Sequence, residues 1–179
     1  MWYIMQSIQS KYSLSERLIR TIAAIRSFPR DNVEDLIGRG ADVNCLHGTL
    51  KPLHCACMVA DADCVELLLQ KEPRAQSPVS RLVSLLVRGL GTEREDSCLD
   101  LLHRATGHLE LRKNGSLPWE VARDPQLCQR LALLCQAPAT LQALSRYAVR
   151  RSLGLRFLPQ AVQQLPLPAC LKDYLLLLT

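Results

Sequence analysis

The chain has 179 residues, of which 48% are hydrophobic, 22% charged and 4% aromatic. This composition is typical of one compact domain or a short repeat array, and it excludes disorder as the dominant state. The net charge of +5 is modest for the length and does not indicate a nucleic-acid-binding tail. The longest uninterrupted apolar run, residues 55–60, is far shorter than the roughly 20 residues that a membrane-spanning helix needs. We therefore expect no membrane partner.

Residues 1–5 differ from a secretory signal, because no basic stretch precedes the apolar part and no small-residue cleavage site follows it. We therefore expect a cytoplasmic protein. Cysteines stay reduced in that compartment, and we interpret the eight cysteines as thiols that pack like small hydrophobic side chains.

The predicted fold class is all-α. Leucine accounts for 35 residues, and all six isoleucines lie at or before Ile37, so most of the chain is poor in the β-branched residues that strands favour. A capping box at Ser13 and Glu16 predicts the start of a first helix, which we expect to end before Pro29. We assign residues 1–30 to this amino-terminal helix.

A helix-pair repeat is predicted after this helix. The apolar pattern of residues 33–37 returns at residues 65–69, a spacing of 32 residues that is typical of repeats built from two short helices. Between the two copies, Pro52 suits the first turn of a helix, where its missing N–H is no loss. We assign residues 31–136 to repeats of this kind.

These repeats resemble the ankyrin family. Residues 40–44, Gly-Ala-Asp-Val-Asn, are similar to the turn that ends an ankyrin repeat, and residues 52–54, Pro-Leu-His, are similar to the Thr-Pro-Leu-His opening of the next. Lys51 replaces the threonine, so the hydroxyl cap is missing. The resemblance implies a structural role for five residues, which are Gly40, Asn44, Pro52, Leu53 and His54.

The predicted ankyrin stack is short and irregular. The repeat that ends at Glu72 should continue into another such turn, but the sequence there reads Glu-Pro-Arg-Ala-Gln. Our hypothesis is that a segment is missing near residues 72–77, as in a shortened splice form. A later insertion is expected at residues 89–95, with helix caps at Thr92 and Asp124 and a turn at Asn114-Gly115.

Residues 137–179 are assigned to a separate carboxyl-terminal unit. A helix that starts near Thr140 carries a largely apolar stripe of Leu141, Ser145 and Val149, which Leu144, Ala148 and Leu153 widen. Residues 165–168 read Leu-Pro-Leu-Pro, and the prolines enforce an extended segment before a last helix. We expect so apolar a tail to cover another surface.

This unit resembles a SOCS box, which has three helices. In that family the first helix inserts into elongin C, and the Leu-Pro-Φ-Pro motif directs the choice of cullin-5. The resemblance implies that Leu141, as the principal anchor, Leu144, Ser145, Ala148 and Val149 bind elongin C, and that Leu165, Pro166, Leu167 and Pro168 bind the cullin. Ser145 stands where cysteine is usual. Because a buried hydroxyl needs a partner, we expect weakened elongin binding.

The cysteines and histidines of residues 45–64 allow two chemical interpretations. A zinc site would lack a Cys-x-x-Cys pair, and Cys55 and Cys57 lie about 200° apart on a helix. A nucleophilic Cys57 beside His54 would lack a third group that orients the histidine. Packed thiols and a structural histidine account better for the pattern, so we predict no catalytic residue, no metal and no cofactor.

The densest basic cluster consists of Arg146, Arg150, Arg151 and Arg156. No aromatic stacking platform accompanies it, which disfavours nucleic acid as a partner. We interpret the cluster as a solvated face or as the rim of a protein interface.

Ankyrin repeats followed by a SOCS box imply a substrate-recognition adaptor. Its expected partners are elongin C, elongin B, cullin-5 with its RING protein, and a protein substrate that the sequence does not name. Such an adaptor performs no chemistry and raises the concentration of its substrate near the ubiquitin-carrying enzyme. The alternative is a non-catalytic binding module, or a shortened competitor that binds elongins without substrate, because repeat arrays usually need about three repeats.

Overall fold

The computed structural model describes residues 14–24, 32–72, 79–88, 94–106, 111, 117–136, 138–153 and 158–178. Within these ranges the chain forms α-helices joined by turns, with one isolated bridge between His47 and Leu50. The all-α prediction is therefore confirmed. Among the described residues, no helix is long and apolar enough to cross a membrane. The features predicted at Ser13, Thr92, Asn114-Gly115 and residues 73–77 lie outside the described residues.

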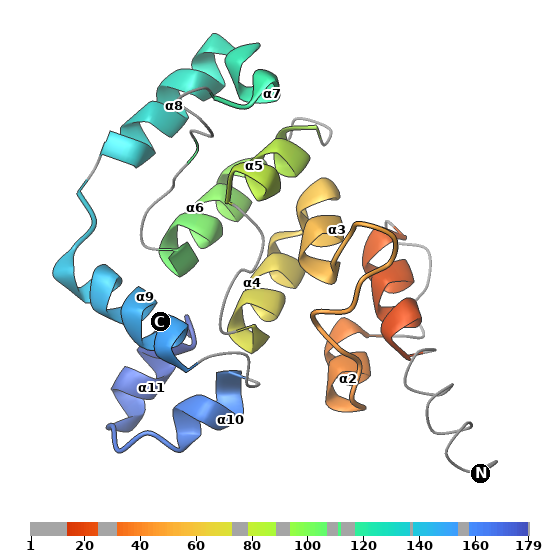
Figure 1. Cartoon of the computed structure of the whole chain (residues 1–179), viewed down its shortest axis with the longest axis vertical. Helices are drawn as coiled ribbons and strands as arrows, with labels where there is room; N and C mark the ends of the chain where they lie inside the picture. The colour runs from red at the N-terminus through yellow and green to blue at the C-terminus, as the bar shows by residue number, and fades with distance from the viewer. Residues whose placement is uncertain are drawn as a thin grey trace.

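The helices up to residue 136 follow one another in pairs (Figure 1). The pairs are residues 14–23 with α2 (Val33–Gly38), α3 (Pro52–Met58) with α4 (Ala62–Lys71), α5 (Val79–Val87) with α6 (Arg94–Thr106), and α7 (Trp119–Ala122) with α8 (Pro125–Gln136). Because α3 packs on α5 and α4 packs on α6, the pairs stack in two rows. The first-helix row contains α3, α5 and α7, and the second-helix row contains α4 and α6.

The stack has one leucine-rich core. Its largest fully buried side chains include Leu18, Leu36, Leu68, Leu82, Leu86, Leu102 and Leu131. Two of the helices that carry these leucines begin at an aspartate side chain. Asp61 Oδ1 accepts from the N–H of Cys64 at 3.2 Å, and Asp124 Oδ1 accepts from the N–H of Leu127 at 3.1 Å. The second bond confirms the helix cap predicted at Asp124.

Three polar contacts join neighbouring helix pairs, and each spans 32 or 34 residues of sequence. They are Arg81 Nη2 to the Thr49 carbonyl oxygen at 3.0 Å, Arg88 Nε to Glu120 Oε1 at 2.8 Å, and Arg130 Nη1 to Asp96 Oδ1 at 2.7 Å. These separations agree with the repeat period of 32 residues found in the sequence.

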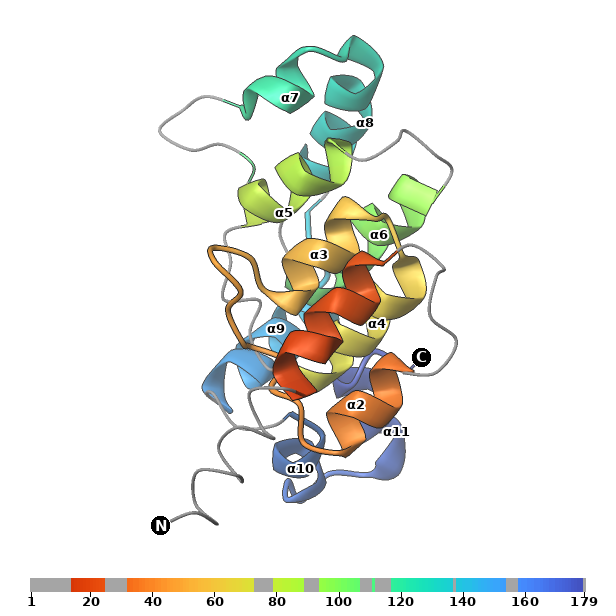
Figure 2. The ribbon, with the colours of Figure 1, turned by 90° about the vertical axis from the view of Figure 1, so that its right-hand side faces the viewer.

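A carboxyl-terminal unit of three helices packs on the second-helix row. It consists of α9 (Leu141–Ser152), α10 (Leu158–Gln163) and α11 (Ala169–Leu175). Its own small core contains Leu158, Val162, Leu175 and Leu176. Helix α9 contacts α6, and α10 contacts α4, while Leu177 joins the core of the stack. Figure 2 shows α10 at the end of the molecule opposite α7 and α8.

Candidate functional site

The first predicted structural residues lie in the turn after α2. Gly40 has a φ of +99°, a left-handed conformation that residues with a Cβ rarely adopt. The backbone N–H of Asn44 donates to Asp42 Oδ1 at 2.8 Å, so the Asp42 side chain closes an Asx turn. Gly40 therefore supplies the left-handed backbone conformation of this turn, and Asn44 supplies a backbone N–H that the turn uses.

The other predicted structural residues open α3, where Pro52, Leu53 and His54 are buried. The backbone N–H of Lys51 donates to Nδ1 of His54 at 3.1 Å. Burial lowers the pKa of His54, and the positive charges of Arg81 and Lys51 act in the same direction. The imidazole is thus held neutral and satisfies a backbone group at the helix start, where Lys51 brings no hydroxyl.

All eight cysteines lie within the described residues and are free thiols. Burial raises the pKa of Cys45 and Cys98 to about 11 and that of Cys64 to about 12, and it also raises the pKa of Cys57. Because the thiolate is the reactive form, these thiols are poor nucleophiles and poor metal ligands. Across the described ranges, no group of three or more His, Cys, Asp or Glu side chains could hold a metal ion.

The outward face of α9 carries the apolar side chains singled out in the sequence. The helix starts where Thr140 Oγ1 accepts from the N–H of Ala143 at 3.1 Å. Leu141 is 81% exposed and Leu144 is 44% exposed, and Ser145 and Ala148 are exposed beside them. The spacing of these residues places them on one side of the helix. We call this set of four residues, Leu141, Leu144, Ser145 and Ala148, the α9 face.

Val149 lies elsewhere, as does Leu153, which was also predicted on the stripe and packs against the small carboxyl-terminal core. Val149 is half-buried and packs against the small core formed around Leu158 and Val162. The structure therefore separates Val149 from the α9 face and gives it a place in the interior of the carboxyl-terminal unit.

The inward side of α9 carries two buried arginines, Arg146 and Arg150. The Arg150 guanidinium donates to the carbonyl oxygens of Leu69, of Glu72 at 3.1 Å and of Leu175 at 2.8 Å. Arg146 donates to the carbonyl oxygen of Arg104 at 2.6 Å, and its guanidinium lies 4.5 Å from the ring centroid of Tyr174. Both side chains thus fix α9 to neighbouring helices.

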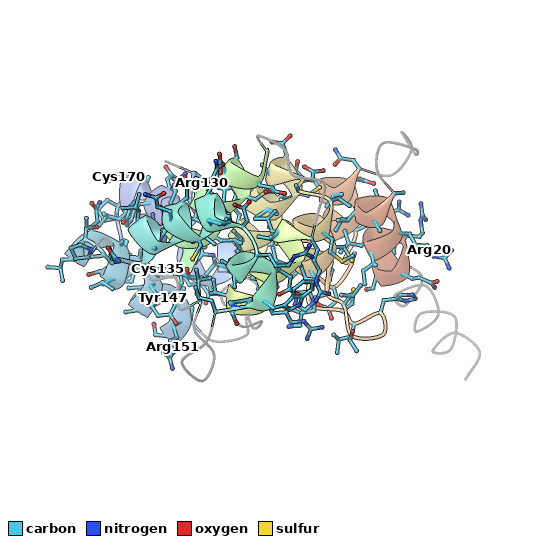
Figure 3. The ribbon with its side chains drawn as sticks, turned by 90° about the horizontal axis from the view of Figure 1, so that it is seen from above. Arg20, Arg130, Cys135, Tyr147, Arg151 and Cys170 are labelled. Atoms are coloured by element: carbon cyan, nitrogen blue, oxygen red, sulfur yellow. The ribbon has the colours of Figure 1, made fainter. Side chains whose placement is uncertain are left out.

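The prediction of a solvated basic face is wrong for these two arginines. Burial lowers the pKa of Arg150 to about 10, and the charge of Arg146 acts in the same direction. Helical spacing places Val149 and Leu153 on the same side of α9 as Arg146 and Arg150. These two apolar residues were the feature of the sequence that could have indicated an inward position for the arginines. Arg151 is exposed and points outward beside Tyr147 (Figure 3), and Arg156 lies outside the described residues.

The Leu-Pro-Leu-Pro segment also has two sides. Leu165 and Leu167 are half-buried and pack against the core of the carboxyl-terminal unit. Pro166 and Pro168 are exposed, and Pro168 stands at the start of α11 with φ −56° and ψ 153°. The leucines therefore hold the segment in place, and the prolines are its exposed part.

Comparisons with known proteins match both parts of the chain. The ankyrin repeat family model matches residues 51–77, and the SOCS box family model matches residues 137–176. Proteins named ankyrin repeat and SOCS box protein 8 from Homo sapiens and Macaca fascicularis are 50% identical over 283 residues, which cover 99% of this chain and 98% of each relative. The relative from Mus musculus is 49% identical with the same coverage. No solved structure matches the chain.

The alignment with these relatives extends over 283 residues, whereas this chain has 179. The relatives therefore contain positions without a counterpart here, although nearly their whole length is covered. Identity at this level over almost the entire chain goes beyond a shared fold. The chain belongs to the ankyrin repeat and SOCS box protein family, whose domain composition is that of a SOCS-box adaptor.

Proposed function

We propose that this chain is the substrate-recognition adaptor of a ubiquitin ligase that contains elongin B, elongin C, cullin-5 and its RING protein. In this proposal residues 1–30, 31–136 and 137–179 form the amino-terminal helix, the ankyrin stack and the SOCS box. The chain acts in the cytoplasm and catalyses no reaction itself. It brings a protein substrate, bound by the stack, close to the ubiquitin-carrying enzyme.

The observation that carries the proposal is the exposed apolar α9 face on a helix whose other side is fixed. Burial of one leucine side chain is worth about 1.5–3 kcal/mol, and Leu141 and Leu144 are exposed in the free chain. Amphipathic helices of this kind insert their apolar face into a groove of a partner. Since Arg150 already holds the inward side, elongin C would meet a preformed surface.

The experiment that tests the proposal is co-expression of the chain with elongin B and elongin C, followed by size-exclusion chromatography. Wild type is compared with Leu141→Asp and with a control, Leu133→Asp, which changes a 64% exposed leucine of α8. We expect wild type and the control to co-elute with the elongins and Leu141→Asp to elute alone, because an unpaired carboxylate is costly in an apolar groove. The proposal is contradicted if Leu141→Asp co-elutes with the elongins as wild type and Leu133→Asp do.

A second function is favoured by the length difference from the relatives. A chain with a shortened stack could retain the α9 face and lack part of the substrate surface, so that it competes with longer members of the family for elongins. Adding excess chain to a reconstituted ligase that contains a longer member would then lower ubiquitin transfer to that member's substrate. Transfer to the same substrate by this chain alone would exclude the competitor function.

A further inference from the structure

Charge is distributed unequally between the two rows of the stack. Helices α3 and α5 contain no acidic residue, and Glu120 is the single one in α7. Helices α4 and α6 of the second-helix row carry five acidic residues, which are Asp63, Glu66, Glu95, Asp96 and Asp100. Acidic side chains are therefore scarce on the first-helix row and concentrated on the second-helix row.

A line of cations follows the first-helix row. Arg81 in α5 and Arg88 directly after it are exposed and seven residues apart, so they project from the same side of this segment. At one end, Arg81 donates to the carbonyl oxygen of Thr49, close to Lys51. Burial lowers the pKa of the nearby His54, and the positive charges of Arg81 and Lys51 lower it further.

At the other end of this line, cations meet an aromatic side chain. Arg88 pairs with Glu120 and neutralises its charge. The next residue towards the amino terminus, Trp119, is 59% exposed, and the guanidinium of Arg123 lies 5.3 Å from its ring centroid. Exposed tryptophan and arginine side chains are the residue types that contribute most to binding energy at protein interfaces. We call Lys51, Arg81, Arg88, Trp119 and Arg123 the cationic strip.

The SOCS box leaves the cationic strip accessible. Its helices α9 and α10 pack on α6 and α4, which belong to the second-helix row (Figure 1). The strip and the α9 face thus lie on different surfaces of the molecule, and a partner on one does not occupy the other.

We propose that the cationic strip binds an acidic segment of the protein substrate. This inference rests on the proposed adaptor function and adds the chemical class of what the adaptor recruits. Acidic side chains would pair with Arg81 and Arg123, and an apolar side chain between them would pack on the Trp119 ring. A protein segment fits better than a nucleic acid, because the strip offers one aromatic ring and few cations, whereas single-stranded nucleic acids need a series of stacking rings.

The test uses fluorescence anisotropy with the full chain bound to elongin B and elongin C. The probe is a fluorescein-labelled peptide of alternating glutamate and leucine, with a lysine-leucine peptide and a single-stranded DNA of equal length for comparison. At about 0.15 M salt, which screens charges beyond roughly 8 Å, we expect the acidic peptide to bind more tightly than either comparison. The double variant Arg81→Glu/Arg123→Glu should weaken it about tenfold or more.

The control variant is Arg151→Glu, which reverses an exposed arginine of α9 outside the strip and should leave the affinity within about twofold. Trp119→Ala should also weaken peptide binding, which a purely electrostatic surface would not show. The proposal is overturned if Arg151→Glu weakens binding as much as the double variant, if the peptide does not bind wild type at this salt concentration, or if DNA binds more tightly. Each variant is also tested for co-elution with elongin B and elongin C. A variant that co-elutes but does not bind the peptide bears on the cationic strip and not on the adaptor proposal.

Discussion

The Arg150 guanidinium donates a hydrogen bond of 3.1 Å to the carbonyl oxygen of Glu72, 78 residues earlier in the chain. Glu72 follows α4, so the arginine lies where unsatisfied helix carbonyls and the negative end of the helix dipole are found. The same guanidinium reaches Leu175 in α11. One buried side chain therefore links the ankyrin stack, the first SOCS-box helix and the last one.

Replacing Arg150 by leucine should destabilise the chain by about 3 kcal/mol. Buried carbonyl groups would lose a charged donor, and hydrogen bonds of that kind contribute about 1.5–3 kcal/mol each, but removing the buried charge also removes its desolvation cost and offsets part of the loss. Urea unfolding followed by circular dichroism measures the loss. We further expect the transition to broaden or to split, because the SOCS box and the stack lose a shared contact.

The matched control for this prediction is Arg151→Leu. Arg151 is the next residue and is exposed, and surface substitutions usually change stability by less than about 0.5 kcal/mol. Equal unfolding midpoints for the two variants would show that the hydrogen bonds of Arg150 contribute little.

Protonation of His54 should destabilise the folded chain. The pKa of His54 is lowered in the fold by burial and by nearby positive charges, whereas in the unfolded chain it returns to about 6.5. Below about pH 6.5 the unfolded chain binds a proton at His54 more readily than the folded chain does. The free energy of unfolding is therefore highest above that pH and falls as the pH drops towards the lowered pKa of the folded chain. Urea unfolding between about pH 7.5 and 5.5 should show this slope in wild type and less of it in His54→Gln.

NMR titration of His54 gives a second measurement of this effect. Arg81→Gln removes one of the charges that lower the pKa, so it should move the pKa of His54 upwards. A His54 that titrates at or above its ordinary value in wild type would be at odds with a neutral structural imidazole.

The thiols should differ sharply in reactivity. Cys170 is exposed, whereas Cys57 and Cys98 are buried and their thiol pKa values are raised. Iodoacetamide at neutral pH should modify Cys170 first and reach Cys57 and Cys98 only after urea unfolds the chain, because the thiolate reacts. Peptide mass spectrometry over time identifies the modified sites. Early labelling of Cys57 in folded chain would revive its interpretation as a nucleophile.

The exposed prolines allow a test of the cullin surface that spares the SOCS-box core. The double variant Pro166→Ala/Pro168→Ala should keep elongin binding and lose most binding to cullin-5, because only the outward side of the segment changes. Leucine substitutions are less informative there, since Leu165 and Leu167 pack in the core and their loss disturbs folding. Pull-down of cullin-5 by the purified elongin complex measures the effect. Undiminished pull-down would place the cullin contact elsewhere.

Local features were predictable from the sequence because their causes are local. Asp124 begins a helix through its own side chain, and Pro52 and His54 act within one turn of α3. The exposure of Leu141 and Leu144 agrees with the surface position that the resemblance to a SOCS box implied, whereas helical spacing alone showed only that they share one side of the helix.

Other features were not predictable, because they depend on contacts between distant segments. Arg150 is buried against main-chain carbonyl groups, and carbonyl acceptors carry no sequence signature. A run of arginines on an amphipathic helix ordinarily indicates a surface position, so Arg146 and Arg150 were interpreted as part of a solvated face or of the rim of a protein interface. The packing of the SOCS box on α4 and α6 also places Leu177 in the core of the stack, which no local pattern indicates.

Introducing cysteine at position 145 should strengthen elongin binding. Ser145 is exposed on the α9 face, so its hydroxyl loses water when a partner covers the helix. The hydroxyl can instead donate a hydrogen bond to the carbonyl oxygen one turn earlier in the helix. This bond reduces the cost of burying the hydroxyl below the roughly 1–3 kcal/mol of an unsatisfied group. We therefore expect Ser145→Cys to bind elongin B and elongin C about three- to fivefold more tightly by isothermal titration calorimetry.

The control for this prediction is Ser84→Cys, which adds a thiol on α5 outside the SOCS box and should leave the affinity unchanged. If Ser145→Cys binds no more tightly than wild type, the serine hydroxyl keeps a hydrogen bond in the complex, and position 145 does not limit affinity. If it binds more tightly while the Leu141→Asp variant does not bind at all, the α9 face is the elongin surface. The loss of water from the side chain at position 145 then limits the affinity of this surface.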